Sequence, residues 1–251
     1  MASHLATVPT LTACNTAYDL MRCKFLGSDQ VVFGSCLYLL CFAILDQTPL
    51  QNLQKCGEFI LEYYKEHQIV ERYRGMTKLS LFMRKKGGPK LKGRAAQVQH
   101  LAAPLCALWQ SKMNPHVEVH RKIPTLLKTS VEMNSLLQAN QHKLAFDPEE
   151  AERFKKCAFA GAQLHRDLSQ HFAEEEKPLL AAIPKIHATL HCALACSYLT
   201  PRLTWCFRQE DNMNVHRVLA KSCCKGIKGP QVTAKMVAKL RVAMRINFCQ
   251  A

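Results

Sequence analysis

The stretch Val31-Val-Phe-Gly-Ser-Cys-Leu-Tyr-Leu-Leu-Cys-Phe-Ala-Ile-Leu45 decides the fold of this chain, because it is an unbroken apolar run without a charged side chain. The run covers 15 residues, and Asp29 and Asp46 stand on either side of it. A helix that spans a bilayer needs about 20 apolar residues. The length therefore predicts a buried core helix and no membrane anchor.

Proline and capping residues mark the starts of further helices. Thr48 can cap a helix whose first position is Pro49, and Asp147-Pro148-Glu149-Glu150 has the same form. Apolar spacing predicts helices over about 94–111 with a kink at Pro104, over 119–139 with a start or kink at Pro124, and over 148–172. Two more begin at Pro184 and at Pro230, the last reaching about Ile246. Only residues 203–207 hint at a strand.

These elements predict a mainly α fold. We expect a helical domain over residues 1–182, which contains a basic loop at 84–94, and a C-terminal segment over residues 183–251. No sequence repeat of fixed period occurs, which disfavours a solenoid. A hydrophobic content of 48% with 21% charged residues is ordinary for a globular protein and argues against wholesale disorder.

The charge balance points to a polyanionic partner. Lys and Arg number 34 against 19 Asp and Glu, so the formal net charge is +15. Residues 72–117 hold ten basic residues and no acid, and residues 212–251 hold eight basic residues and no acid. Such tracts are typical of surfaces that bind nucleic acid, although lysines that only keep a protein soluble give the same count.

Two groups of side chains are the candidate nucleic-acid contacts. The first lies in a loop that Gly87-Gly88-Pro89 breaks, and we expect this loop to be flexible. The second lies on the terminal helix. Both groups should bind phosphates without reading base sequence. The candidates are Arg84, Lys85, Lys86, Lys90, Lys92 and Arg94 in the loop, and Lys235, Lys239, Arg241 and Arg245 on the helix.

The 13 cysteines do not suggest a disulfide scaffold. Their number is odd, no signal peptide opens the sequence, and many stand in apolar helical patterns. Examples are Cys36, Cys41, Cys56, Cys106, Cys157 and Cys192. We therefore expect reduced thiols in an intracellular protein, nuclear or cytoplasmic and not secreted.

A metal site is not predicted at the densest group of potential ligands. His187 and His191 share a helix face at the spacing that can hold zinc, but Cys192 and Cys196 lie about 100° around the helix axis. Gly-rich phosphate loops and nucleophile elbows do not occur. An enzymatic Cys or His site stays open, and one thiol that reacts far faster than the other twelve would reveal it.

Glu210 is the one candidate catalytic residue. It stands in Trp205-Cys-Phe-Arg-Gln-Glu210-Asp211, where an acid can simply complement the positive end of a helix. The alternative is that Glu210 belongs to a cluster of acids around two magnesium ions. Such a cluster needs two further acids from elsewhere in the chain.

At these residues the chain resembles transposase-related proteins of the CACTA (En/Spm) and KDZ types. The resemblance rests on Ile183-Pro-Lys-Ile-His187-x-x-x-His191 and Pro201-Arg-Leu-Thr-Trp205-Cys-Phe-Arg-Gln-Glu210, which are similar to the C-terminal part of their RNase H-like domain. There the Glu completes an acidic triad. Residues 27–42 resemble the helix after the second catalytic Asp, and residues 47–182 would match a helical insertion.

The departures from that pattern imply an inactive fragment. The second Asp of the family would fall near Lys24 or Phe25, and neither side chain binds magnesium. The first would lie upstream of Met1. A single carboxylate cannot hold two metal ions, so we expect no activity from this chain alone and no cofactor, with magnesium relevant only if the acidic site is intact.

The sequence therefore predicts a transposase-derived fragment that binds nucleic acid without sequence specificity through its two basic tracts. The alternative is an all-helical interaction module whose basic surface binds an acidic protein. Affinity for duplex DNA that falls steeply with salt favours the first, and indifference to DNA favours the second.

Overall fold

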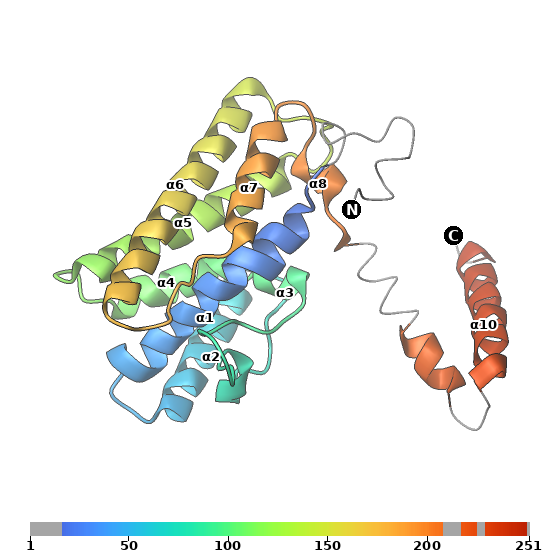
Figure 1. The fold of residues 1–251 in the computed structure, drawn as a ribbon, viewed down its shortest axis with the longest axis horizontal. Helices are drawn as coiled ribbons and strands as arrows, with labels where there is room; N and C mark the ends of the chain where they lie inside the picture. Colours follow the sequence, from blue (N-terminus) through green and yellow to red (C-terminus); the bar gives the residue numbers. More distant parts are fainter. Residues whose placement is uncertain (1–16, 208–216, 225–228, 250–251) are drawn as a thin grey trace, which may run out of the picture. The chain divides into compact units, whose positions relative to one another are not determined.

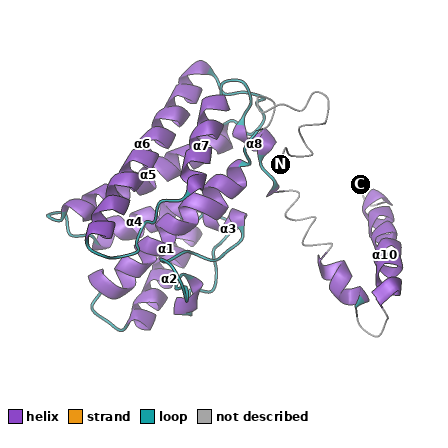
Figure 2. Cartoon of the chain, in the orientation of Figure 1, coloured by secondary structure: helices purple, strands orange, loops and turns teal. Residues whose placement is uncertain are grey.

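The computed structural model describes residues 17–207, 217–224 and 229–249. Within these ranges the regular structure is helical and no strand occurs (Figure 2). The predicted mainly α fold is confirmed. Residues 203–207, where a strand was expected, instead contain the end of α8 (Pro201–Thr204), a short turn of helix that Pro201 opens at its first position.

The chain forms two compact units, Met1–Trp205 and Cys206–Ala251. This division differs from the expected boundary after residue 182. The reason is α7 (Pro184–Ala195), which packs against α6 and η3 and so lies inside the first unit. The second unit contains a helix over 217–223 and α10 (Gly229–Cys249).

Residues 31–44 of the long apolar run form the second half of a longer helix. This helix consists of η3 (Met21–Ser28), α1 (Asp29–Leu39) and η4 (Leu40–Ile44), and Leu26 departs from helical geometry at φ −93° and ψ 15°. It is long and apolar enough to cross a membrane, a criterion that the core helix of a soluble protein also meets. In its most apolar window 78% is buried inside the unit, as expected of a core helix.

Figure 1 draws α1 in the lower middle of the unit, with α2 on one side and α5, α6 and α7 towards the other, and α1 packs against α3 and α4. The side chains of Phe33, Leu37, Tyr64, Phe82 and Trp109 form the centre of one apolar cluster. The other helices of this unit are α2 (Pro49–Glu66), η5 (Leu79–Leu81), α3 (Ala95–Gln99), α4 (Ala102–Lys112), α5 (Glu118–Ala139) and α6 (Pro148–Glu174).

Most helix starts lie where capping chemistry predicts them. Thr48 forms a capping box with Gln51, and Pro49 occupies the first position of α2. At α6, Pro148 is again first, but the Asp147 side chain does not cap the helix, because it accepts a hydrogen bond from Lys143 Nζ at 2.6 Å. The expected cap residue is therefore in place and has a different partner.

The expected kink at Pro104 is wrong. The helical segment breaks at His100 and Leu101, between α3 and α4, and Pro104 lies in the first turn of α4. A proline in the first turn lacks only an N–H that has no helical partner, so it is tolerated there without a kink. Pro124 stands inside α5, which begins at Glu118.

Candidate functional site

The basic loop at 84–94 lies on the surface of the first unit, between η5 and α3. Arg84, Lys85, Lys86, Lys92 and Arg94 are exposed, and Lys90 is half-buried. Within the described residues, no carboxylate lies within ion-pair distance of any of the six. Their charges are therefore available to a partner.

Backbone hydrogen bonds hold this loop against the helices, which differs from the expected flexible loop. The amide of Leu91 donates to the carbonyl of Gln30 on α1 at 2.8 Å. The amide of Lys90 donates to the carbonyl of Phe82 at 2.8 Å, and the amide of Lys92 donates to the carbonyl of Leu81 at 2.8 Å. Both carbonyls lie in the segment just before the loop. The Tyr73 hydroxyl donates to the carbonyl of Lys92. These bonds fix the backbone at Lys90, Leu91 and Lys92.

Two glycines permit the close approach of the loop. A Cβ on Gly34 of α1 would lie 2.7 Å from the backbone nitrogen of Leu91 and 2.9 Å from Lys90 Cα. A Cβ on Gly88 would lie 1.9 Å from the carbonyl oxygen of Pro178, in the segment after α6. Because real Cβ atoms do not come so near to backbone, only glycine allows the loop to pack on both neighbours.

Lys185 joins the basic loop from a distant part of the sequence. It stands in the first turn of α7, and its Nζ donates to the carbonyl of Leu26 at 3.1 Å. Burial and the positive charges of Lys185 and Arg84 lower the pKa of Lys90. Lys90, Arg84 and Lys185 therefore lie in one region of the surface. The sequence did not predict this, since no local signal relates position 185 to positions 84–94.

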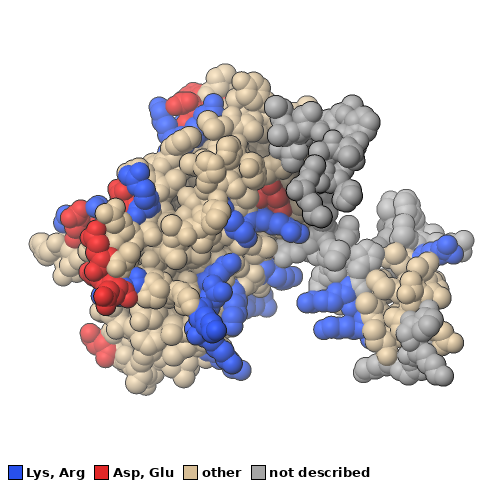
Figure 3. All heavy atoms as spheres, viewed as in Figure 1, with Lys and Arg blue, Asp and Glu red and all other residues tan. Residues whose placement is uncertain are grey.

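Positive side chains are concentrated in one part of this face of the unit. Figure 3 shows the largest group of Lys and Arg from the centre towards the lower right, whereas most Asp and Glu lie along the left edge, beside further Lys and Arg. We call the group formed by Arg84, Lys85, Lys86, Lys90, Lys92, Arg94 and Lys185 the basic surface. A concentration of unpaired positive charge next to few acids attracts a polyanion such as a phosphate backbone.

The second basic tract lies in the other unit. On α10, Arg241 is exposed, and Lys235 and Lys239 are half-buried. Lys239 Nζ donates to Ser222 Oγ at 3.0 Å, which connects α10 to the helix at 217–223. Arg245 stands on α10, and its side chain lies outside the described part of the chain. Glu210, the candidate catalytic acid, also lies outside the described residues.

The histidine and cysteine group on α7 does not converge. His187 Nε2 and His191 Nε2 are 2.9 Å apart on the exposed side, and His191 stacks on Tyr18 with ring centroids 5.2 Å apart. Cys192 and Cys196 are buried on the other side. Over the described ranges, no three His, Cys, Asp or Glu side chains come together as a metal site would require.

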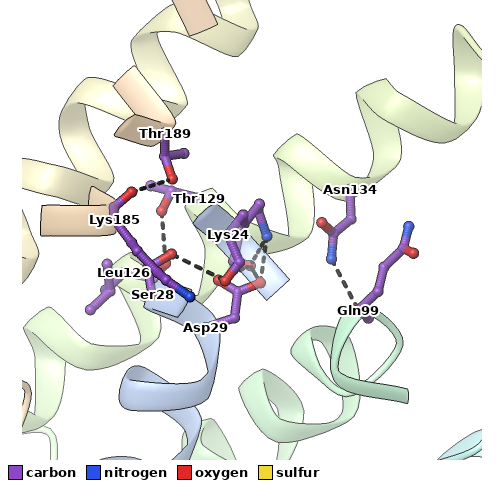
Figure 4. A network of polar contacts seen from close by, with 10 residues as sticks. Lys24, Ser28, Asp29, Gln99, Leu126, Thr129, Asn134, Lys185 and Thr189 are labelled. Atoms are coloured by element: carbon purple, nitrogen blue, oxygen red, sulfur yellow. Dashed lines mark hydrogen bonds and ion pairs between the residues drawn. The ribbon is translucent and has the colours of Figure 1, made fainter. Parts of the chain in front are cut away.

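A buried polar cluster is the main feature of the interior that the sequence analysis did not find (Figure 4). Lys24 Nζ donates to Asp29 Oδ2 at 2.7 Å and to Ser130 Oγ at 2.6 Å, so η3, α1 and α5 meet at one ion pair. Burial lowers the pKa of Lys24 and raises that of Asp29, while their mutual attraction opposes both shifts. The cluster borders a cavity of about 50 Å³.

This cluster fits a structural role better than catalysis. Lys24, Asp29 and Ser130 are hydrogen-bonded to one another, and the side chains of Lys24 and Asp29 are only 2% and 7% exposed, so the cluster presents no group to a substrate. The cavity has room for one or two waters, far below the ~300–1,000 Å³ of pockets for drug-sized ligands. The basic surface is therefore the stronger candidate site.

The chain matches no protein-family model, no curated protein and no solved structure. Descent from a CACTA or KDZ transposase stays a prediction from the sequence.

Proposed function

We propose that this protein binds nucleic acid without sequence specificity, through the basic surface of its first unit. One observation carries the proposal: the six cations of the loop have no carboxylate partner in the described chain. Lys185 adds a seventh positive charge beside them. Cations that replace condensed counterions along a phosphate backbone contribute affinity that is independent of base sequence.

The anchored backbone supports binding over mere solubility. Lysines that only solvate a protein need no defined position. Here the carbonyl of Gln30 and the close approach at Gly34 hold the loop against α1. A surface whose charges are already in position loses less conformational entropy when it binds. Strand transfer is not part of the proposal, because Glu210 would need two further acids to hold two metal ions.

The test is the salt dependence of duplex binding. Replacing Lys85, Lys86, Lys90 and Lys92 by Ala should reduce the slope of log Kd against log salt by about three to four units, at about 0.9 per phosphate contact. The matched control removes four lysines of α5 and α6, namely Lys122, Lys128, Lys155 and Lys156, and should leave the slope unchanged.

Two results would contradict the proposal. The first is an equal change in the salt slope of log Kd in the loop variant and in the control variant. That result would mean that only the net charge of the protein matters. The second is a wild-type protein that ignores DNA and RNA but binds an acidic protein, which would support the alternative of an interaction module.

A further inference from the structure

A groove of about 180 Å³ lies beside the basic surface. Its apolar walls come from Tyr38 of α1, Met83 just before the basic loop, Pro89 of the loop, and Leu179 after α6. Two cations, Arg84 and Lys177, also line it. The groove therefore combines an aromatic ring, apolar walls and positive charge in one place.

The aromatic wall is part of a surface pair. The ring of Tyr38 stacks on that of Phe42, one helical turn later, with centroids 4.7 Å apart and an interplanar angle of 23°. Phe42 is 42% exposed. Tyr38 is half-buried, packs against the core as well as on Phe42, and keeps part of its side chain in the lining of the groove.

The walls of the groove are held together. Gly88 lies against the carbonyl of Pro178, and the amide of Leu180 donates to Ser35 Oγ of α1 at 2.9 Å. Three segments far apart in the sequence, α1, the basic loop and residues 177–180, are thus joined around it. Because the groove is formed before a ligand binds, its walls do not have to be ordered on binding, and no affinity is lost to the conformational entropy of ordering them.

We propose that this groove holds one unstacked base of a single-stranded nucleic acid, with the base against Tyr38 and the adjoining phosphates on Arg84, Lys90 and Lys185. The inference rests on the proposed function and adds to it a preference for single strands. A base in a strand has a free face that can stack on an aromatic side chain, whatever its identity. In a duplex both faces are already covered by neighbouring bases.

The charges around the groove define the path of the backbone. Lys177 pairs with Glu175 at 2.8 Å, and Glu174 and Glu176 stand on either side of that acid in the chain. These carboxylates repel phosphates at the Lys177 end. Arg84 has no acidic partner in the described chain, and Lys90 follows Pro89 directly. The phosphates therefore run from the groove across the basic surface.

An acidic protein partner would contact the lysines but would have no need of the Tyr38 ring. The variant that separates the two is Tyr38→Leu, with Tyr38→Phe to keep the ring and remove the hydroxyl. Tyr198→Leu is the matched control, because Tyr198 is 85% exposed and lies between α7 and α8, outside the groove.

The experiment measures the affinity of each variant for a short mixed-sequence DNA strand, for the same strand as RNA, and for the DNA duplex. Tyr38→Leu should weaken binding of both single strands by about 5-fold to 150-fold, the range for one lost base stack. Its salt slope should not change, since no charge is removed. Tyr38→Phe and Tyr198→Leu should bind as the wild type does. Tyr38→Leu should keep its duplex affinity, and an unchanged melting temperature shows that this variant is folded.

The outcomes distinguish this inference from the proposed function. If the loop lysine variant loses its salt slope while Tyr38→Leu binds single strands like the wild type, the groove is overturned and non-specific binding stands. Equal loss of single-strand and duplex affinity in a folded Tyr38→Leu variant would also overturn it. If the wild type binds no nucleic acid at all, both fail together.

Discussion

Lys24 and Asp29 form an ion pair of 2.7 Å inside the first unit, with side chains only 2% and 7% exposed. Ser130 of α5 accepts a hydrogen bond from the same ammonium and lies 3.3 Å from Asp29 Oδ1. The pair thus joins the start of the central helix to α5. Buried ion pairs add little net stability over an apolar pair, but they are costly to break on one side.

Lys24→Met should destabilise the fold by about 3–5 kcal/mol, because it leaves the Asp29 carboxylate buried without its partner. The double variant Lys24→Met/Asp29→Leu should recover most of that loss. Urea unfolding of the two single variants, the double variant and the wild type gives the coupling energy. Additive losses would mean that the two side chains do not depend on one another.

As the pH falls from neutral towards 4, the Lys24→Met variant should gain stability relative to the double variant Lys24→Met/Asp29→Leu. Burial raises the pKa of Asp29 above its ordinary value of 3.8. A carboxyl whose pKa is higher in the folded state than in the unfolded state stabilises the fold when the pH is below 3.8, and this stabilisation is lost as the pH rises through the pKa of the folded state. Removing Lys24 raises the pKa further, so protonation in this window relieves the buried charge. The free energy of unfolding at several pH values measures the effect.

The double variant is the reference for that pH series. Burial lowers the pKa of His165, so the fold loses stability as pH falls below 6.5 in every variant. The contribution of His165 cancels when the free energy of unfolding of Lys24→Met is subtracted from that of the double variant. This difference in free energy should shrink as the pH falls. A difference that is constant with pH would contradict a charged Asp29 in the single variant.

Gly34→Ala should destabilise the fold by about 1–3 kcal/mol, because its Cβ would meet the backbone of Lys90 and Leu91. The control is Gly57→Ala, also buried in a helix. There the new Cβ would lie 3.1 Å from Cβ of Met76 and no closer than 3.9 Å to a backbone atom of that residue, so the crowding is smaller and the gain in helix propensity opposes it. Thermal melts of both variants test the prediction, and equal melting temperatures would contradict the close approach of loop and helix.

Magnesium or manganese should leave the melting temperature unchanged. The resemblance to transposases implies an Asp of the metal site near Lys24 or Phe25, and the Lys24 ammonium is instead buried against Asp29. A cation there repels a divalent ion. Thermal melts with and without metal, for the wild type and for Glu210→Gln, check this. A magnesium-dependent rise that Glu210→Gln abolishes, together with nicking of DNA, would make the chain an enzyme.

The sequence by itself determined the helical fold and most helix starts. Thr48 with Pro49, Pro148 and Pro184 each act on their own helix, through bonds and sterics within a few residues, so their effect can be predicted from neighbours alone. The exposed charges of residues 84–94 were equally evident, because a loop rich in Lys with Gly-Gly-Pro cannot be buried.

Only the tertiary structure decided which distant groups meet. Ser130 lies 106 positions from Lys24, and Lys185 joins a loop almost a hundred positions before it. Those contacts depend on which faces of α5 and α7 are turned towards η3, and the local sequence pattern does not determine which faces these are. The break at His100 instead of Pro104 has the same origin, since packing of α3 and α4 on the core decides where the helix ends. The groove at Tyr38 likewise exists only because α1, the basic loop and residues 177–180 pack together.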